Sequence, residues 1–298
     1  MNDAKIIAIT QPLLPIKDEQ NKVLIMRAEE FIAYTARVSN PSNQHNTLTS
    51  EKLLKYLIEH KHWSPFEMVS ITMEINTTRD ISHQIIRHRS FSFQEFSQRY
   101  ADPTKDMQFV TREARLQDAK NRQNSIETDD ALLMNNWKKR QNFISESALK
   151  NYTWAINNGI AKEQARAVLP EGLTTTRLYM SGTLRSWIHY IDVRAEEGTQ
   201  KEHRQVALAA QEEILKHFPS LREYWFPEPW FHGVPVNKSE EEPKDVVYAA
   251  PHETPCWTLK NTWGTNISEQ ELNKKWVETF GNKSPSDKPK SWWWKFWS

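Results

Sequence analysis

Residues 68–100, MVSITMEINTTRDISHQIIRHRSFSFQEFSQRY, hold the pattern that decides the fold. Over 68–76 apolar and polar side chains alternate strictly, which is typical of a strand that buries one face in an antiparallel or mixed sheet. The next segment has helical spacing and predicts a helix on which Gln84, Arg87 and His88 share one face. Beyond this helix the pattern becomes irregular or extended. The stretch therefore predicts a strand that leads into a helix with polar side chains at its end.

Further strands and amphipathic helices are predicted around this unit, within residues 1–225. Pro65 ends one of the helices, because proline cannot continue a helix. A polar stretch over 112–130 predicts an excursion on the surface. Strands are expected over 5–9, 108–111 and 173–180, and helices over 28–38, 50–61, 130–158, 183–194 and 200–217. We therefore predict an α+β domain in which a mixed or antiparallel sheet is wrapped by helices.

Residues 226–298 are rich in Trp and Pro and are predicted to be a separate C-terminal extension. Aromatic residues without helical or strand periodicity predict a segment that packs over the domain or over a partner. This extension contains Cys256, the only cysteine of the chain. A single cysteine excludes an intrachain disulfide and a multi-cysteine metal site, and we predict no metal site.

The overall charge of the chain is nearly balanced. Its 298 residues include 39 Lys and Arg against 38 Asp and Glu, for a formal charge of +1. No global field therefore attracts nucleic acid or a membrane, and any anion must bind locally. The sequence has only 7 glycines and no Gly-rich phosphate loop, which argues against a Rossmann or Walker-type site. Because it also lacks a membrane-spanning apolar run and the layout of a signal peptide, we expect a cytoplasmic protein.

The segment after the predicted helix has the chemistry of an anion site. Glu95, Ser97 and Arg99 alternate with Phe96 and Gln98, so that three polar side chains project to one side of an extended chain. Arginine grips a phosphate with a rigid fork of donors, and serine hydroxyls fill the remaining lone pairs. A solvated basic helix end with a salt-bridging glutamate is the structural alternative.

The spacing of Arg87-His88-Arg89, seven residues and then Ser97 resembles the signature of the flavin-dependent thymidylate synthases. Other segments are similar to that family in order and approximate spacing, and the resemblance covers about residues 5–225. They are Ala-Arg-Val-Ser ending at Ser39, His-Trp-Ser-Pro-Phe-Glu from His62 to Glu67, Arg-Ala-Val-Leu-Pro from Arg166, and a helix with Arg185, His189 and Arg194.

The resemblance implies conversion of dUMP to dTMP, with methylenetetrahydrofolate as carbon donor and NADPH reducing a bound FAD. It implies a homotetramer whose active sites are shared between chains. The implied catalytic residue is Arg194, which would stabilise charge on the uracil. The implied substrate-binding residues are Gln84, Arg87, Glu95, Phe96, Ser97, Gln98, Arg99, Arg166 and Arg194, with His62 on the folate side. The implied flavin-binding residues are Ser39, Ser64, Arg87, His88, Arg89, Glu95, Thr183, Arg185 and His189.

Three positions depart from the family pattern: Met68 stands where histidine is usual, and Gln94 and Thr183 stand where asparagine is usual. We expect the local flavin contacts near Gln94 and Thr183 to differ, and Met68 cannot supply what the usual imidazole contributes. An unrelated class of thymidylate synthase attacks its pyrimidine with a cysteine thiolate, but Cys256 lies far from every motif. Ser97 as a covalent nucleophile is a rival hypothesis, although no dedicated base stands near it in sequence.

Two other classes of protein are compatible with the same residues. A nucleotide-binding regulatory protein could use the arginine cluster without redox chemistry. A nucleic-acid-binding module could combine Arg87-His88-Arg89 with stacking phenylalanines. The presence of a flavin and the salt dependence of binding distinguish these alternatives from the enzyme.

Overall fold

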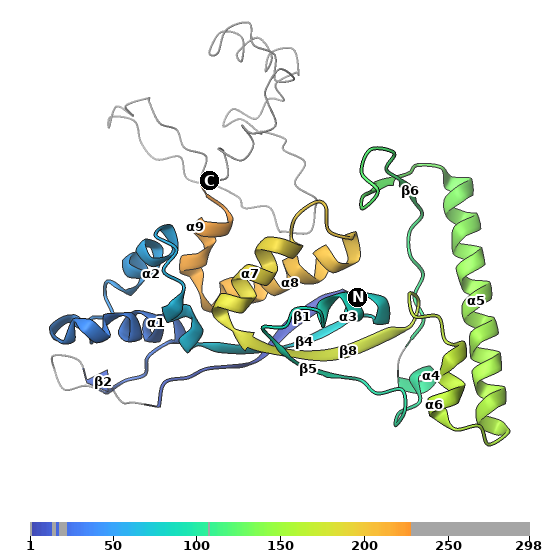
Figure 1. The fold of residues 1–298 in the computed structure, drawn as a ribbon, viewed down its shortest axis with the longest axis horizontal. Helices are drawn as coiled ribbons and strands as arrows, with labels where there is room; N and C mark the ends of the chain where they lie inside the picture. Colours follow the sequence, from blue (N-terminus) through green and yellow to red (C-terminus); the bar gives the residue numbers. More distant parts are fainter. Residues whose placement is uncertain (1, 14–15, 18–22, 107, 228–298) are drawn as a thin grey trace, which may run out of the picture. The chain divides into compact units, whose positions relative to one another are not determined.

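A four-stranded antiparallel sheet forms the centre of the computed structural model, which describes residues 2–13, 16–17, 23–106 and 108–227 (Figure 1). The strand order is β1-β4-β8-β5, and each neighbouring pair runs antiparallel. These strands are β1 (Asp3–Ile9), β4 (Ser70–Thr78), β8 (Thr175–Thr183) and β5 (Ser92–Glu95). The predicted α+β class is confirmed, and of the two kinds of sheet that the alternation allowed, the antiparallel one is found.

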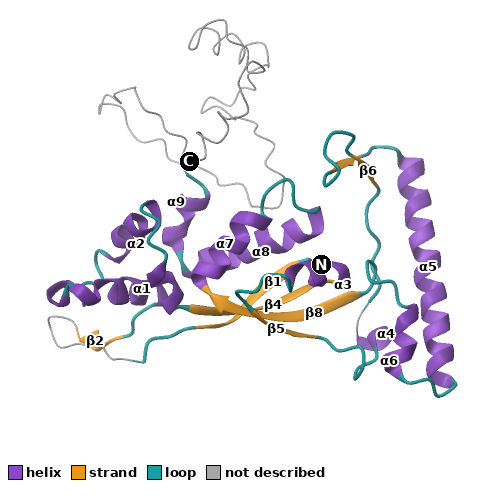
Figure 2. Cartoon of the chain, in the orientation of Figure 1, coloured by secondary structure: helices purple, strands orange, loops and turns teal. Residues whose placement is uncertain are grey.

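One face of the sheet carries the core. Val69, Ile71, Met73 and Ile75, the apolar set of the predicted strand, are all fully buried. Helices α7 (Leu184–Arg194) and α8 (Lys201–His217) lie over this face (Figure 2). The fully buried Trp187 of α7 donates from its indole nitrogen to the carbonyl oxygen of Ile71 at 3.1 Å, so the largest core side chain also has its polar atom satisfied.

Most of the remaining elements lie toward the two ends of this two-layer centre (Figures 1 and 2). The helices and 3-10 turns are α1 (Ala28–Ala36), η1 (Arg37–Ser39), η2 (Pro41–Asn43), α2 (Ser50–Glu59), η3 (Ser64–Met68), α3 (Arg79–Ile85), α4 (Pro103–Asp106), α5 (Ala131–Asn157), α6 (Lys162–Ala165), η4 (Arg166–Val168), η5 (Pro219–Leu221) and α9 (Arg222–Trp225). Two small hairpins are β2 (Ile16–Lys17) with β3 (Val23–Leu24), and β6 (Arg115–Gln117) with β7 (Ser125–Glu127). Within the described ranges, no helix is both long and apolar enough to cross a bilayer.

The helix that follows β4 is shorter than predicted. It ends at Ile85, so Arg87 and His88 stand in the turn beyond it and do not share a helical face with Gln84. The physical reason is Phe91, which is buried and packs edge-on against Trp187 with ring centroids 4.9 Å apart. The chain must turn to bring this ring into the core. The motif residues are consequently presented on a loop.

Gly182 of β8 makes room for that buried ring. A Cβ atom at this position would lie 2.4 Å from Cδ1 of Phe91, which is closer than atoms can approach. The glycine and the phenylalanine therefore form a matched pair in which the missing side chain accommodates the aromatic one. This pair fixes the path of the loop between Arg87 and β5.

One smaller prediction is wrong. Residues 108–111 do not form a strand, since they make only an isolated bridge between Phe109 and Thr174. The polar stretch 112–130 has no buried residue, as predicted for a surface excursion, and it contains the β6–β7 hairpin.

Helix α5 has nearly its predicted bounds. The side chain of Asp130 caps it by accepting from the backbone N–H of Leu133 at 2.9 Å, and Gly159 follows it with a φ of 79°. Helical spacing places six apolar residues of this helix near one face. Of these, Ala148 and Tyr152 are buried and Ile156 is half-buried, whereas Leu133, Trp137 and Ile144 are exposed. The helix therefore leaves much of its apolar surface uncovered within one chain.

The predicted extension over 226–298, with Cys256, falls almost entirely outside the described residues, which end at residue 227. The division of the chain at residue 225 stays a prediction.

Candidate active site

A contact between Arg194 and His88 brings the last motif of the chain against the Arg-His-Arg motif. Arg194 is the C-terminal residue of α7, and its Nε donates to Nε2 of His88 at 2.9 Å. Burial, with help from the charges of Arg194 and His189, lowers the pKa of His88 to about 4. The imidazole is therefore neutral at physiological pH and accepts the hydrogen bond. Arg194, predicted as the catalytic residue, is thus held beside the Arg-His-Arg motif.

A cavity of about 520 Å³ lies between the η3 turn and the start of α7. It is lined by three residues from the predicted site, His62, Ser64 and Arg185. Arg185 also forms an ion pair with the carboxylate of Glu67. A hydroxyl group and a guanidinium facing one open cavity suit the oxygen atoms of a phosphate or diphosphate.

Lys61 lines the same cavity and was not predicted from the sequence. Its φ is 56°, a left-handed conformation that a non-glycine residue rarely adopts. The residue lies just past α2, where its backbone N–H donates to the carbonyl oxygen of Ile58 at 3.0 Å. A lysine at a helix end is common, and no pattern in the sequence separates this one from a surface lysine.

The other predicted flavin residues lie on neighbouring segments. Thr183 is the N-cap of α7, and its hydroxyl accepts from the backbone N–H of Ser186 at 3.3 Å. The hydroxyl of Thr183 therefore has a structural role as the cap of this helix. His189 is exposed one turn beyond Arg185, and Ser39 is exposed at the end of η1. Arg87 and Arg89 lie on the turn on either side of His88, with Arg87 and Arg89 both accessible to solvent.

Ser97 and Arg99 lie on the turn that follows β5. The backbone N–H of Arg99 donates to Oγ of Ser97 at 3.4 Å, and the guanidinium pairs with Glu163 of α6 at 3.3 Å. Arg166 follows α6 directly in η4, so this packing brings the segments that carry Ser97, Arg99 and Arg166, three of the predicted substrate-binding residues, together. The result is a second cationic group, separate from the cavity at η3.

Three predicted residues next to Ser97 in the sequence, Glu95, Phe96 and Gln98, are held in place by contacts within the chain. Glu95 accepts from Arg79 at 3.3 Å and from the hydroxyl of Thr176 at 2.9 Å, so its carboxylate is already engaged within the chain. Phe96 is half-buried and its backbone N–H donates to the carbonyl oxygen of Arg177 at 2.9 Å. Gln98 is buried. These contacts fix the start of the turn that carries Ser97.

The register of the sheet separates the two cationic groups. Ser92 pairs with Ser181 and Glu95 pairs with Leu178, so the chain runs from the α7 end of β8 toward its beginning. Ser97 and Arg99 therefore lie near the beginning of β8, whereas Thr183 and Arg185 lie at its end. The nine residues of β8 span about 26 Å at about 3.3 Å per residue. Within one chain, the structure does not bring these two groups together.

Comparison with known proteins agrees with the resemblance seen in the motifs. Residues 23–220 match the sequence pattern of the family described as thymidylate synthase complementing protein. The chain is similar to the probable flavin-dependent thymidylate synthase of Paramecium bursaria Chlorella virus 1, with 47% identity over 218 residues, or 73% of this chain and 96% of the relative. It is also similar to the flavin-dependent thymidylate synthase of Synechocystis sp., with 48% identity over 219 residues, or 74% of this chain and 97% of the relative.

A more distant relative is similar over much of the same region. The flavin-dependent thymidylate synthase of Thermus thermophilus is 30% identical over 208 residues, which cover 69% of this chain and 75% of the relative. The family match spans most of the sheet, the motif loop, the cavity at η3 and the whole of α7. The chain belongs to the thymidylate synthase complementing protein family.

Proposed function

We propose that this protein is a flavin-dependent thymidylate synthase, which converts dUMP to dTMP with methylenetetrahydrofolate as carbon donor and NADPH as reductant of FAD. The observation that carries the proposal is the 2.9 Å hydrogen bond between Arg194 and His88. It joins two motifs that are 106 residues apart in the chain at one place in the fold. Family membership and the names of the relatives support the same reaction.

Arg194 is suited to activate the uracil ring. The C5 atom of uracil is a weak nucleophile until negative charge builds up on the N3 and O4 edge of the ring. Only Nε of Arg194 is used by His88, and its two terminal amino groups have no hydrogen-bond partner among the described residues. Because neutral His88 holds the guanidinium in one orientation, these donors can stabilise the developing charge without reorganisation.

The cavity at η3 is the proposed flavin site. Lys61 and Arg185 supply positive charge and Ser64 supplies a hydroxyl, a donor set that fits the diphosphate of FAD. When bound, FAD supplies the hydride that completes the methyl group. His62 lies in the same lining and is proposed to face the folate.

Ser97 is proposed to bind the nucleotide phosphate together with Arg99 and Arg166. In the described part of the chain, Oγ of Ser97 makes one hydrogen bond, to the backbone N–H of Arg99, and no imidazole or carboxylate contacts it. A serine nucleophile needs such a base in contact with its hydroxyl. The binding role is therefore the one that we propose.

We propose that the active enzyme is a homotetramer whose sites combine residues from different chains. Two features of the single chain support this. The residues proposed to bind the phosphate, around Ser97, and those proposed to bind the flavin, around Arg185, lie toward opposite ends of β8. In addition, α5 exposes large apolar side chains that are suited to an interface, among them Phe143 at 70% and Trp154 at 62% exposure. A cytoplasmic location remains a prediction from the sequence.

An absorbance spectrum of the purified protein tests the proposal. We expect a yellow protein whose flavin absorbance is bleached by NADPH without oxygen and restored when dUMP and methylenetetrahydrofolate are added. A protein that remains colourless after incubation with FAD, or whose reduced flavin does not respond to both substrates, would contradict it. No observation favours the regulatory or nucleic-acid-binding alternatives.

A further inference from the structure

His203 of α8 is a fully buried histidine that lies directly behind Gln84. Both of its ring nitrogens have a partner. Nδ1 is 3.2 Å from Oε1 of Gln84, and Nε2 is 3.1 Å from the hydroxyl oxygen of Tyr190. The ring of Tyr190 in turn packs edge-on against His88, with centroids 5.0 Å apart. One buried imidazole thus contacts the element that carries Gln84 and the aromatic ring that supports His88.

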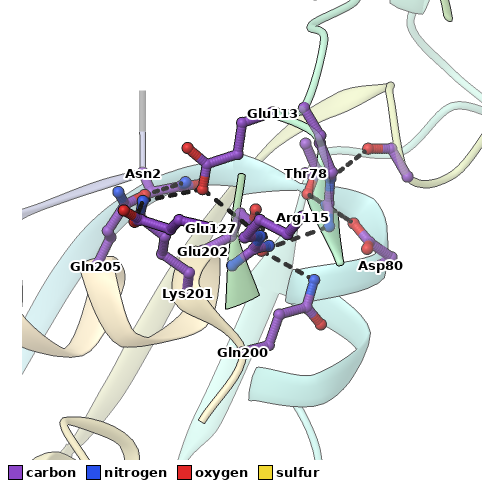
Figure 3. A network of polar contacts seen from close by, with 12 residues as sticks. Asn2, Thr78, Asp80, Glu113, Arg115, Glu127, Gln200, Lys201, Glu202 and Gln205 are labelled. Carbon is purple, nitrogen blue, oxygen red and sulfur yellow. Dashed lines mark hydrogen bonds and ion pairs between the residues drawn. The ribbon is translucent and has the colours of Figure 1, made fainter. Parts of the chain in front are cut away.

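The contacts of His203 continue from Gln84 to Gln200 and from Gln200 to Glu202. The charge of Glu202 determines which atom donates in each of these hydrogen bonds. Glu202 is a carboxylate and can only accept hydrogen bonds. Burial acts to raise the pKa of Glu202, but its hydrogen bonds and nearby arginines outweigh that effect and lower it. Arg115 donates to it at 2.6 Å, and both side chains are drawn in Figure 3. The amide of Gln200 must therefore turn its nitrogen toward Glu202, at 3.0 Å.

Each later contact is then determined by the one before it. With its nitrogen turned to Glu202, Gln200 offers its oxygen to the amide nitrogen of Gln84 at 2.8 Å. Gln84 consequently turns its own oxygen toward His203. Because an amide oxygen only accepts, Nδ1 of His203 must carry the proton, and Nε2 must accept from the hydroxyl of Tyr190. We call this series of hydrogen bonds the relay. Each member donates to the next, from Tyr190 through His203, Gln84 and Gln200 to Glu202.

The relay leaves Gln84 with one unused donor. Its oxygen is taken by His203, and one of its two N–H groups is taken by Gln200. In the described residues the second N–H has no partner. A ligand that meets Gln84 must therefore offer an acceptor, such as a phosphate or carbonyl oxygen, and an amide turned the other way would present its oxygen and repel that ligand.

We propose that His203 is a positioning residue for nucleotide binding, which fixes the amide of Gln84 so that its free N–H faces an acceptor oxygen of dUMP. The inference rests on the proposed function, in which Gln84 contacts the nucleotide. The ring also remains neutral, because burial, with the charges of Arg194 and His88, lowers the pKa of His203 to about 3. A doubly protonated ring would have no lone pair for Tyr190.

Two substitutions of His203 by amide side chains of similar size and polarity distinguish a role in positioning Gln84 from a role in packing the core. His203→Asn places an amide nitrogen where Nδ1 stands and keeps a donor for Gln84. His203→Gln reaches the position of Nε2 and loses that donor. We expect the dissociation constant for dUMP to stay within about 3-fold of the wild type in His203→Asn and to rise about 10-fold or more in His203→Gln, a change of about 1.4 kcal/mol. A merely structural role predicts that both variants weaken binding equally.

The measurement is calorimetric titration of the flavin-loaded tetramer with dUMP, with flavin content and melting temperature as controls. Equal dissociation constants in the two variants would overturn the positioning role of His203. If the wild type still turns over dUMP in that case, the proposed function is not affected. A wild-type protein that holds flavin and does not bind dUMP would overturn the proposed function itself.

Gln200→Leu provides a second test that does not disturb the core, since Gln200 is only half-buried at the start of α8. This variant cuts the relay on the other side of Gln84 and leaves His203 in place. The relay predicts that its dissociation constant for dUMP rises at least about 3-fold with unchanged flavin content. An unchanged dissociation constant would contradict a fixed orientation of the Gln84 amide.

Discussion

Arg194, the last residue of α7, donates a 2.9 Å hydrogen bond to His88, which stands in the turn after α3. The contact holds the proposed catalytic guanidinium against the motif loop and leaves its terminal amino groups unused by the described residues. Charge stabilisation on the uracil, as proposed here, depends on this pair of side chains.

Replacement of Arg194 by lysine should lower kcat strongly while flavin content stays the same. Lysine keeps the positive charge but has no Nε–H for His88 and no planar fork for the uracil edge. We expect kcat to fall about 100-fold or more, as is typical when a preorganised donor is lost. Steady-state kinetics with dUMP measure this. An Arg194→Lys variant with near wild-type kcat would show that the charge alone is sufficient.

The stability of the fold should decrease as the pH falls from about 6.5 toward 4. His88 and His203 have pKa values lowered to about 4 and about 3 from an ordinary value near 6.5, so in this range the unfolded chain binds more protons than the folded chain. Their contribution is fully present above pH 6.5 and is lost as the pH passes down through the folded pKa values. Melting temperatures across this range should change less in His203→Asn, which cannot titrate. An identical slope in both proteins would show that His203 does not contribute.

Ser97→Ala should retain turnover and show a raised KM for dUMP. In the proposed role Ser97 contributes one hydrogen bond to the phosphate, and such a loss costs about 1 kcal/mol. Kinetic assays that separate kcat from KM make the distinction. Complete loss of kcat with unchanged dUMP binding would instead support a covalent role for this serine.

Gly182→Ala should destabilise the fold, because the new Cβ would lie 2.4 Å from the ring of Phe91. Overpacking of this kind costs about 1–3 kcal/mol. Gly198→Ala is the matched control, since a Cβ at Gly198 has no atom within 4 Å. Urea denaturation of the two variants gives the difference in the free energy of unfolding. Equal values would mean that the loop after Arg87 can move away from β8.

The strands and helices that pack by simple periodicity could be predicted from the sequence. The alternation in β4 identified its buried face, and Trp187 and Ile188 of α7 point inward as their spacing indicated. The end of α3 could not be predicted, because it is set by the packing of Phe91 against Trp187, which is a contact between distant segments. Lys61 was missed for a similar reason, since its proposed role in the flavin site depends on a cavity that forms only in the fold.

The site was predicted as a set of residues and not as an arrangement. The resemblance to the family implied Arg185, Ser64 and His62, which line one cavity, and Arg194 with His88, which are in contact. It did not reveal that Ser97 and Arg99 lie toward the other end of β8. A pattern of residue types along the chain contains no distances between segments, and the strand register supplies them.

Sharing of active sites between chains can be tested by mixing two inactive variants. Arg194→Ala removes the proposed contact with uracil, and Arg99→Glu replaces a positive charge by a negative one among the residues proposed to bind the phosphate. If each site draws these residues from different chains, co-expressed variants form some tetramers with an intact site, and part of the activity returns. Light scattering should show a tetramer in each case. An active monomer, or no recovery in mixed tetramers, would contradict shared sites.

The most direct test of the proposed function is the formation of dTMP from dUMP by the flavin-loaded protein in the presence of methylenetetrahydrofolate and NADPH, followed by chromatography. We predict dTMP from the wild type and at least about 100-fold less from Arg194→Ala with the same flavin content. A wild-type protein that oxidises NADPH and forms no dTMP, or an Arg194→Ala variant that forms it at the wild-type rate, would contradict the account.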